Sequence, residues 1–132
     1  MTLHPALAND TSPVHTTQYS QILLMDDSRW PWFILVPIQP DINELHDLND
    51  DQRNAFMADV NHVSRVLQNT TGCRSVNVAM LGNVVSQLHC HIVARETDDP
   101  AWPKPVWGFE NRISYADQWP ESLTRAMRSS FS

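Results

Sequence analysis

Two histidines placed two residues apart are the residues of this sequence best suited to chemistry. His89 and His91 lie within the run Gln87–Val93, and apolar residues follow them. A useful fraction of imidazole is unprotonated near neutral pH, so it can attack phosphorus, and the phosphoryl group it then carries can pass to water. The pair therefore permits nucleophilic catalysis at phosphorus, in which one histidine attacks while the other binds phosphoryl oxygens or assists the leaving group.

Two other interpretations of the pair remain open. The first is a metal site, because His-x-His on a strand is a common ligand pair and neutral imidazole suits zinc, copper or iron. A further ligand would be needed, and none stands at a recognised spacing. The candidates are His46, His62, Asp26 and Asp27. The second interpretation makes both histidines ordinary surface or hydrogen-bonded core residues, which their repetition at i and i+2 disfavours.

The histidines are predicted to project from a strand within residues 84–95. Side chains alternate between the two faces of a strand. The face that carries both histidines also holds Gln87, Val93 and Arg95. The opposite face holds Leu88, Cys90, Ile92 and Ala94. We therefore expect the first face to line a site and the second to join a core, where Cys90 is a small buried residue and not a nucleophile.

The remaining pattern indicates an α+β fold, an antiparallel sheet of about five strands with one long helix packed on it. Short apolar or alternating runs predict further strands at residues 21–25, 32–36 and 75–80. Asn49 and Gln52 form a capping-box pattern, and apolar residues then recur at helical spacing to about Thr70. Gly72 follows as a helix stop.

Length, charge and cysteine content narrow the class of protein. We expect the 132 residues to form a single domain, with an N-terminal arm at 1–20 and a Pro- and Trp-rich C-terminal extension at 96–132. A net charge of -6 argues against binding a nucleic-acid backbone or an anionic membrane through a broad electrostatic surface. No apolar run is long enough to span a bilayer. Two cysteines without CxxC spacing and an N-terminus without a signal-peptide pattern favour a reduced, cytoplasmic protein.

Several motifs, in the same order and at matching spacing, resemble the histidine triad (HIT) family. Gln87–Val93 is similar to the family signature, His-x-His-x-His followed by apolar residues. Trp32–Pro37 resembles the family's apolar strand that ends in proline, and Glu44–Leu48 leads into the long helix as in the dinucleoside polyphosphate hydrolase branch. Gly82–Ser86 stands where members carry a glycine, a polar residue and a valine. The resemblance runs roughly from residue 22 to residue 107 and implies a HIT-like fold.

The resemblance implies a nucleotidyl hydrolase or transferase. It would cleave a diadenosine polyphosphate or a nucleoside phosphoramidate at the α-phosphate, through a nucleotidyl-histidine intermediate. By position, His89 would be the nucleophile and His91 would contact the phosphoryl oxygens and the bridging atom. Asn83 would donate a hydrogen bond near the scissile phosphate. Asp26 or Asp27 lies close to where the family binds the ribose hydroxyls.

Apolar side chains are further candidates for the substrate pocket that the resemblance implies. Ile22 and Trp32 would contact the base or belong simply to the core, while Trp102 and Trp107 would shape the pocket or a dimer interface. The resemblance also implies a purine nucleotide as substrate and a homodimer. No metal-ligand set is apparent in the sequence, so no required cofactor is expected, although Mg²⁺ could accompany a polyphosphate substrate.

Two residues depart from the family pattern. Gln87 stands in the first triad position, so it is expected among the catalytic residues, where it can hydrogen-bond but cannot carry charge. The strand before Pro37 has Trp32 or Phe33 where well-known members carry a histidine that orients its neighbours. These departures leave open a purine-nucleotide-binding protein with little or no turnover, and a His-ligated metalloprotein is the third hypothesis.

Overall fold

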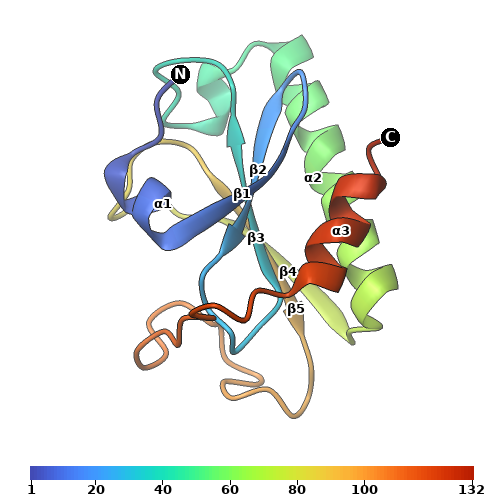
Figure 1. The fold of residues 1–132 in the computed structure, drawn as a ribbon. Helices are drawn as coiled ribbons and strands as arrows, with labels where there is room; N and C mark the ends of the chain where they lie inside the picture. The colour runs from blue at the N-terminus through green and yellow to red at the C-terminus, as the bar shows by residue number, and fades with distance from the viewer.

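A five-stranded antiparallel sheet forms the centre of the computed structural model, which describes residues 1–132 (Figure 1). The strands are β1 (Thr11–Thr16), β2 (Ser20–Met25), β3 (Trp32–Pro37), β4 (Ser75–Met80) and β5 (Cys90–Arg95), in the spatial order β1-β2-β3-β5-β4. The helices are α1 (Pro5–Asp10), the 3₁₀ helix η1 (Leu45–Asp47), α2 (Asp50–Thr71) and α3 (Glu121–Ser129). The predicted α+β class is confirmed. None of the helices has the length and apolar character needed to span a membrane.

The long helix α2 begins and ends where its sequence predicts. Asn49 Oδ1 accepts a hydrogen bond from the Gln52 amide at 2.8 Å, and the Asn49 amide donates to Gln52 Oε1 at 3.0 Å. At the other end Gly72 adopts a φ of 69°, which glycine reaches without a steric penalty, and its amide donates to the Gln68 carbonyl at 2.8 Å. Local signals therefore fix both ends of this helix.

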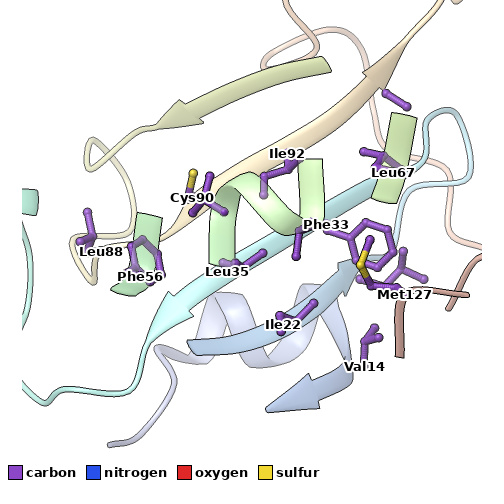
Figure 2. Close-up of a cluster of buried hydrophobic side chains, with 14 of the residues drawn as sticks. Val14, Ile22, Phe33, Leu35, Phe56, Leu67, Leu88, Cys90, Ile92 and Met127 are labelled. Carbon is purple, nitrogen blue, oxygen red and sulfur yellow. The ribbon is translucent and has the colours of Figure 1, made fainter. Parts of the chain in front are cut away.

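Helices α2 and α3 cover the same face of the sheet, to the right in Figure 1. The apolar stripe of α2 consists of Phe56, Val60, Val63 and Leu67. It belongs to one buried cluster with sheet residues that include Phe33, Leu35 and Ile92, and Met127 of α3 joins them (Figure 2). Each such large apolar side chain contributes about 1.5–3 kcal/mol through burial.

The opposite face of the sheet is covered by α1 and by the segment 96–120, which contains no helix or strand. The sheet residues of this second cluster are Leu23, Trp32, Ile34, Val36 and Val93. Leu7 of α1 and Ala101 and Val106 of the segment pack on them. This face also carries the two histidines, so irregular chain covers the region where a site is expected.

Residues 1–20 are more regular than the arm that the sequence predicts. They contain α1 and β1, and β1 is an edge strand that pairs antiparallel with β2. The sequence pattern hid this strand because it contains Pro13, and its register shifts between Pro13 and His15. Proline is tolerated in sheets mainly at edges and bulges, so the edge position accommodates it.

The strand that carries the histidines is shorter than predicted. The β4–β5 ladder ends at the pair Met80–Cys90, so residues 81–89 form the connection between the two strands and not a strand of their own. The alternation of faces nevertheless extends back beyond Cys90. Leu88 joins the cluster under α2, whereas the ring of His89 lies beside that of His91.

Candidate active site

His89 and His91 lie side by side on the sheet face away from α2. Their ring centroids are 4.8 Å apart with the planes at 72°, and the residues are only 5% and 7% exposed. A cavity of about 280 Å³ opens beside them. Its lining consists of Leu81, Asn83, Val84, Val85, His89, His91 and Trp107. The predicted pairing of two histidines on a site-lining face is thus present in the folded chain.

The hydrogen bond of His89 determines which ring nitrogen can react. His89 Nδ1 lies 2.7 Å from the backbone carbonyl oxygen of Gln87. A carbonyl oxygen can only accept, so Nδ1 must carry the proton in this contact. In the neutral ring Nε2 then holds an unshared electron pair, which is the requirement for a nucleophile.

The hydrogen bond of His91 imposes the opposite arrangement. Trp32 Nε1 donates to His91 Nδ1 at 3.1 Å. An indole N–H can only donate, so Nδ1 accepts and the proton of the neutral ring sits on Nε2. Burial, and secondarily repulsion from His89, lowers the pKa of His91 to about 3. His91 is therefore a neutral hydrogen-bond donor at physiological pH.

The model of the HIT domain family matches residues 7–98. The chain belongs to the HIT family. No curated protein matches it.

Solved structures of HIT proteins resemble the whole chain. A histidine triad protein of Bradyrhizobium japonicum is 38% identical with a TM-score of 0.95, over 99% of this chain and 98% of that one. A HIT protein of Sinorhizobium meliloti is 40% identical with a TM-score of 0.87, over 98% and 93% of the two chains. A diadenosine triphosphate hydrolase of Plasmodium falciparum, at 16% identity, shares the fold with a TM-score of 0.62 over 89% and 72%. These findings support a HIT function of the nucleotide-binding or hydrolase type.

Gln87, in the first triad position of this HIT chain, does not face the cavity, contrary to its predicted place among the catalytic residues. Its Oε1 accepts from the His4 amide at 2.7 Å. Its Nε2 donates to the Thr2 carbonyl oxygen at 3.1 Å and lies 3.3 Å from Met1 Sδ. The alternation of faces therefore ends at Leu88, and the side chain of Gln87 bonds the N-terminal segment instead. The side chain fastens the N-terminal segment to the connection before the histidines.

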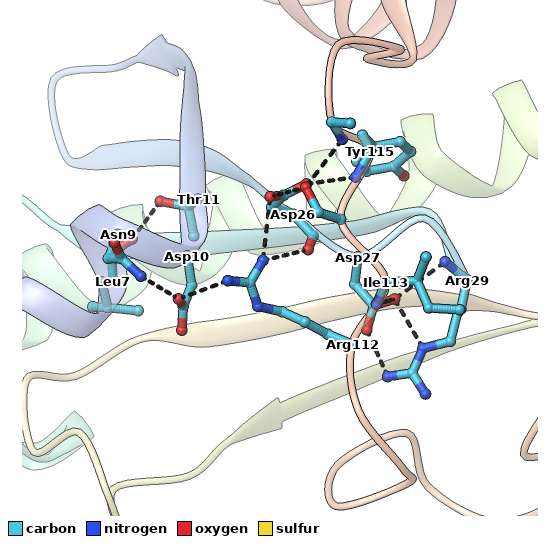
Figure 3. A network of polar contacts seen from close by, with 12 residues as sticks. Leu7, Asn9, Asp10, Thr11, Asp26, Asp27, Arg29, Arg112, Ile113 and Tyr115 are labelled. Carbon is cyan, nitrogen blue, oxygen red and sulfur yellow. Dashed lines mark hydrogen bonds and ion pairs between the residues drawn. The ribbon is translucent and has the colours of Figure 1, made fainter.

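Asp26 holds the C-terminal segment in place and does not line the histidine cavity (Figure 3). Its carboxylate accepts from the Ser114 hydroxyl at 2.7 Å, from the Tyr115 amide at 2.8 Å and from Arg112 at 3.2 Å. Burial opposes its ionisation, but these hydrogen bonds and the Arg112 charge outweigh it and hold the pKa of Asp26 below its ordinary value. The predicted contact with a ribose finds no support in this geometry.

Asp27 is buried and forms an ion pair with Arg29. Arg29 donates to both of its carboxylate oxygens, at 2.9 and 2.8 Å, and also to the Phe109 carbonyl oxygen at 2.6 Å. With a side chain only 1% exposed, Asp27 has no free oxygen to offer a ligand. Both aspartates therefore fix the path of the segment that carries Trp107, and the geometry gives the predicted ribose contact of Asp27 no support.

The apolar candidates separate into two groups. Ile22 lies fully buried in the cluster under α2, on the face opposite the histidines, which favours the core role that the sequence also allows. The Arg95 guanidinium lies over the Trp102 ring, with Arg95 Cζ 5.7 Å from the ring centroid. Trp102 does not line the cavity. Trp107 does line it, with its ring 5.3 Å from that of His91.

No group of three or more His, Cys, Asp or Glu side chains lies close enough together to hold a metal ion. His46 is exposed on η1. His62 Nε2 lies 2.8 Å from the Ser130 hydroxyl at the far side of α2. The geometry thus gives the two site histidines no third ligand, and we propose no metal centre.

Sequence reasoning missed the hydrogen bond from Trp32 to His91. The available signal was the tryptophan itself, which departs from the family pattern at this position. Sequence reasoning also missed the buried ion pair of Arg95 with Asp99, which ties the covering segment to β5. An arginine within the otherwise apolar run after the histidines was its only signal.

Proposed function

We propose that the protein is a HIT-type nucleotidyl hydrolase or transferase. It cleaves a nucleotide conjugate, a diadenosine polyphosphate or a nucleoside phosphoramidate, at the α-phosphate through a nucleotidyl-His89 intermediate. One observation carries this proposal. The contacts of the two rings leave an electron pair on His89 Nε2 and a proton on His91 Nε2, beside one cavity.

The reaction proceeds in two displacements. The electron pair of His89 Nε2 forms a bond to the α-phosphorus, and the bond from phosphorus to the leaving group breaks with its electrons. His91 Nε2–H and the Asn83 amide donate hydrogen bonds to the phosphoryl oxygens, where negative charge develops. Water then attacks the phosphorus, its proton passes to solvent, and the N–P bond returns its electrons to His89. The nucleoside monophosphate is released.

The lining of the cavity supports an α-phosphate of low charge. It contains no Lys, Arg, Asp or Glu, only the two imidazoles, one amide and apolar side chains. Neutral donors suit a phosphate that carries one negative charge, as an internal phosphate does, better than a terminal dianion. Any further charge of a polyphosphate could be carried by Mg²⁺ bound to the substrate itself.

A purine-nucleotide-binding protein with little turnover is the second candidate. It is favoured by the neutrality of His91 and by Gln87, whose side chain contributes nothing to the cavity. A site without a cation stabilises a phosphoryl transition state less than one that holds a charged histidine.

We also propose a homodimer formed through β4. This strand is a free edge of the sheet, and an unpaired edge is a template for pairing with another chain. Val78 on this strand and Leu81 and Val84 just after it are exposed apolar residues, and Val84 is 93% exposed. A second copy would offer the same surface, as a two-fold interface requires.

Both cysteines are buried free thiols, which supports a reducing, cytoplasmic location.

The test follows release of adenosine monophosphate from a diadenosine polyphosphate and from an adenosine phosphoramidate, with chelator-treated protein. We expect release by the wild type, a nucleotidyl adduct on His89 detected by mass spectrometry, and loss of both in His89→Ala. His46→Ala is the matched control, because His46 is exposed on η1. Turnover at the wild-type rate in His89→Ala would overturn the nucleophile, and binding without release would favour the second candidate.

A further inference from the structure

We propose that Trp32 is a positioning residue that holds His91 as a neutral Nε2–H donor. The site then expels leaving groups that depart as anions and discriminates against those that must be protonated. This inference rests on the proposed nucleotidyl transfer and deepens it, because it selects phosphoric anhydrides over phosphoramidates.

The sheet register brings the two side chains together. Trp32 pairs with Val93 and Ile34 with His91 across β3 and β5, so Trp32 and His91 are diagonal neighbours on one face. An aromatic side chain reaches across such a diagonal. The indole nitrogen lies 3.1 Å from His91 Nδ1, and the two ring centroids are 5.6 Å apart.

Neighbouring rings keep the Trp32 indole in this position. Trp30 and Trp107 lie edge-on to it, with centroids at 6.4 and 6.2 Å. Trp32 itself is only 4% exposed. A rotation that broke the contact with His91 would displace packed aromatic side chains, which close packing makes costly.

The contact excludes the charged form of His91. A protonated imidazole carries a hydrogen on both nitrogens, so one N–H would point at the indole N–H. The titratable group that faces the ring is His89, and it repels a second positive charge. No acidic side chain lines the cavity to offset that charge. Burial of the ring also disfavours the charged form and lowers the pKa of His91.

A neutral His91 restricts the leaving group. To give up its Nε2 proton it would have to become an imidazolate, because Nδ1 has no proton to keep. When a P–O–P bond breaks, the electron pair stays on oxygen and the phosphate departs as an anion without a proton. When a P–N bond breaks, the departing amine must gain a proton, and His91 cannot supply it. The anhydride is therefore the better substrate.

The first arm of the test reads the tautomer of His91 directly. In ring ¹⁵N spectra of the wild type we expect the Nε2–H form without titration over roughly pH 5 to 8. In Trp32→Phe, which removes the donor and keeps a ring, we expect the other tautomer of His91, with the proton on Nδ1, to appear. Trp102→Phe is the matched control for the tautomer, because Trp102 lies beside Arg95 and does not line the cavity. Titration of His91 in the wild type over this range would overturn the proposal.

The second arm compares kcat/KM for a diadenosine polyphosphate with that for an adenosine phosphoramidate. We expect the wild type to prefer the anhydride, and the ratio to fall by about tenfold or more in Trp32→His, which offers an exchangeable proton. An unchanged ratio in this variant, or a wild-type preference for the phosphoramidate, overturns the leaving-group argument. If the wild type turns over neither substrate, the proposed function fails, while the spectra still decide the role of Trp32.

Discussion

Asp99 and Arg95 form a buried ion pair. Replacing a single oxygen atom of Asp99 is therefore expected to destabilise the fold severely. The Asp99 carboxylate accepts hydrogen bonds from Arg95 Nε at 2.7 Å and from Arg95 Nη2 at 3.1 Å. The amides of Glu96, Ala101 and Trp102 donate to it at 3.1, 3.1 and 2.8 Å. In Asp99→Asn one oxygen becomes an NH₂ group, which would face N–H donors and leave Arg95 without its countercharge.

The expected cost follows from burial. The side chains of Arg95 and Asp99 are 2% and 8% exposed, and removing one partner of such a pair costs about 3–5 kcal/mol. In a domain of this size the melting temperature should fall by roughly 10 to 20 °C. Asp50→Asn is the matched control, because Asp50 is 88% exposed and pairs with Arg53 at the surface. It should cost less than about 1 kcal/mol.

Thermal melts followed by circular dichroism over a range of pH would test this reasoning. Burial opposes ionisation of Asp99, but the Arg95 hydrogen bond and the backbone amides hold its pKa well below the ordinary 3.8. Its stabilising contribution is therefore complete above about pH 5 and shrinks as the pH falls below about 4. The gap between wild type and Asp99→Asn should narrow in acid. A melting-temperature shift no larger than that of the control at pH 7 would refute the argument.

Three further outcomes are expected. Gln87→Ala should keep turnover within roughly threefold of wild type while hydrogen exchange rises in residues 1–4, and a loss as deep as that of His89→Ala would contradict the tethering role. Phe56→Ala should lower the free energy of unfolding by about 3–5 kcal/mol in denaturant titrations, because the side chain is buried under α2, and a loss below about 1 kcal/mol would refute it. Burial raises the pKa of the Cys90 thiol to about 12, so a thiol reagent at pH 8 should label it only after unfolding, and prompt labelling of the native protein would contradict this.

The sequence was most informative where structure is set by neighbours along the chain. The Asn49 cap, the glycine stop at Gly72 and the spacing of the α2 stripe are local signals, and all three are present in the fold. The alternation of faces around His89 and His91 was also readable, because a period of two places them together whatever pairs with the strand.

Sequence reasoning was least informative where a role depends on a distant partner. The sequence predicts that Asp26 binds a ribose. In the structure its hydrogen-bond donors lie in the segment 112–115, almost ninety residues later in the chain. Gln87 looked like a member of the catalytic group, and its side chain bonds the N-terminal segment instead. β1 was hidden because its pairing with β2, and not its composition, makes it a strand.

The sequence by itself determined the fold class and the placement of His89 and His91 on one face of the sheet. Only the tertiary structure decided the protonation state of each ring. His89 takes its tautomer from a carbonyl oxygen two residues away, whereas His91 takes its own from an indole on another strand. A hydrogen bond across the sheet depends on register, and register is a property of the folded sheet that no local pattern around His91 encodes.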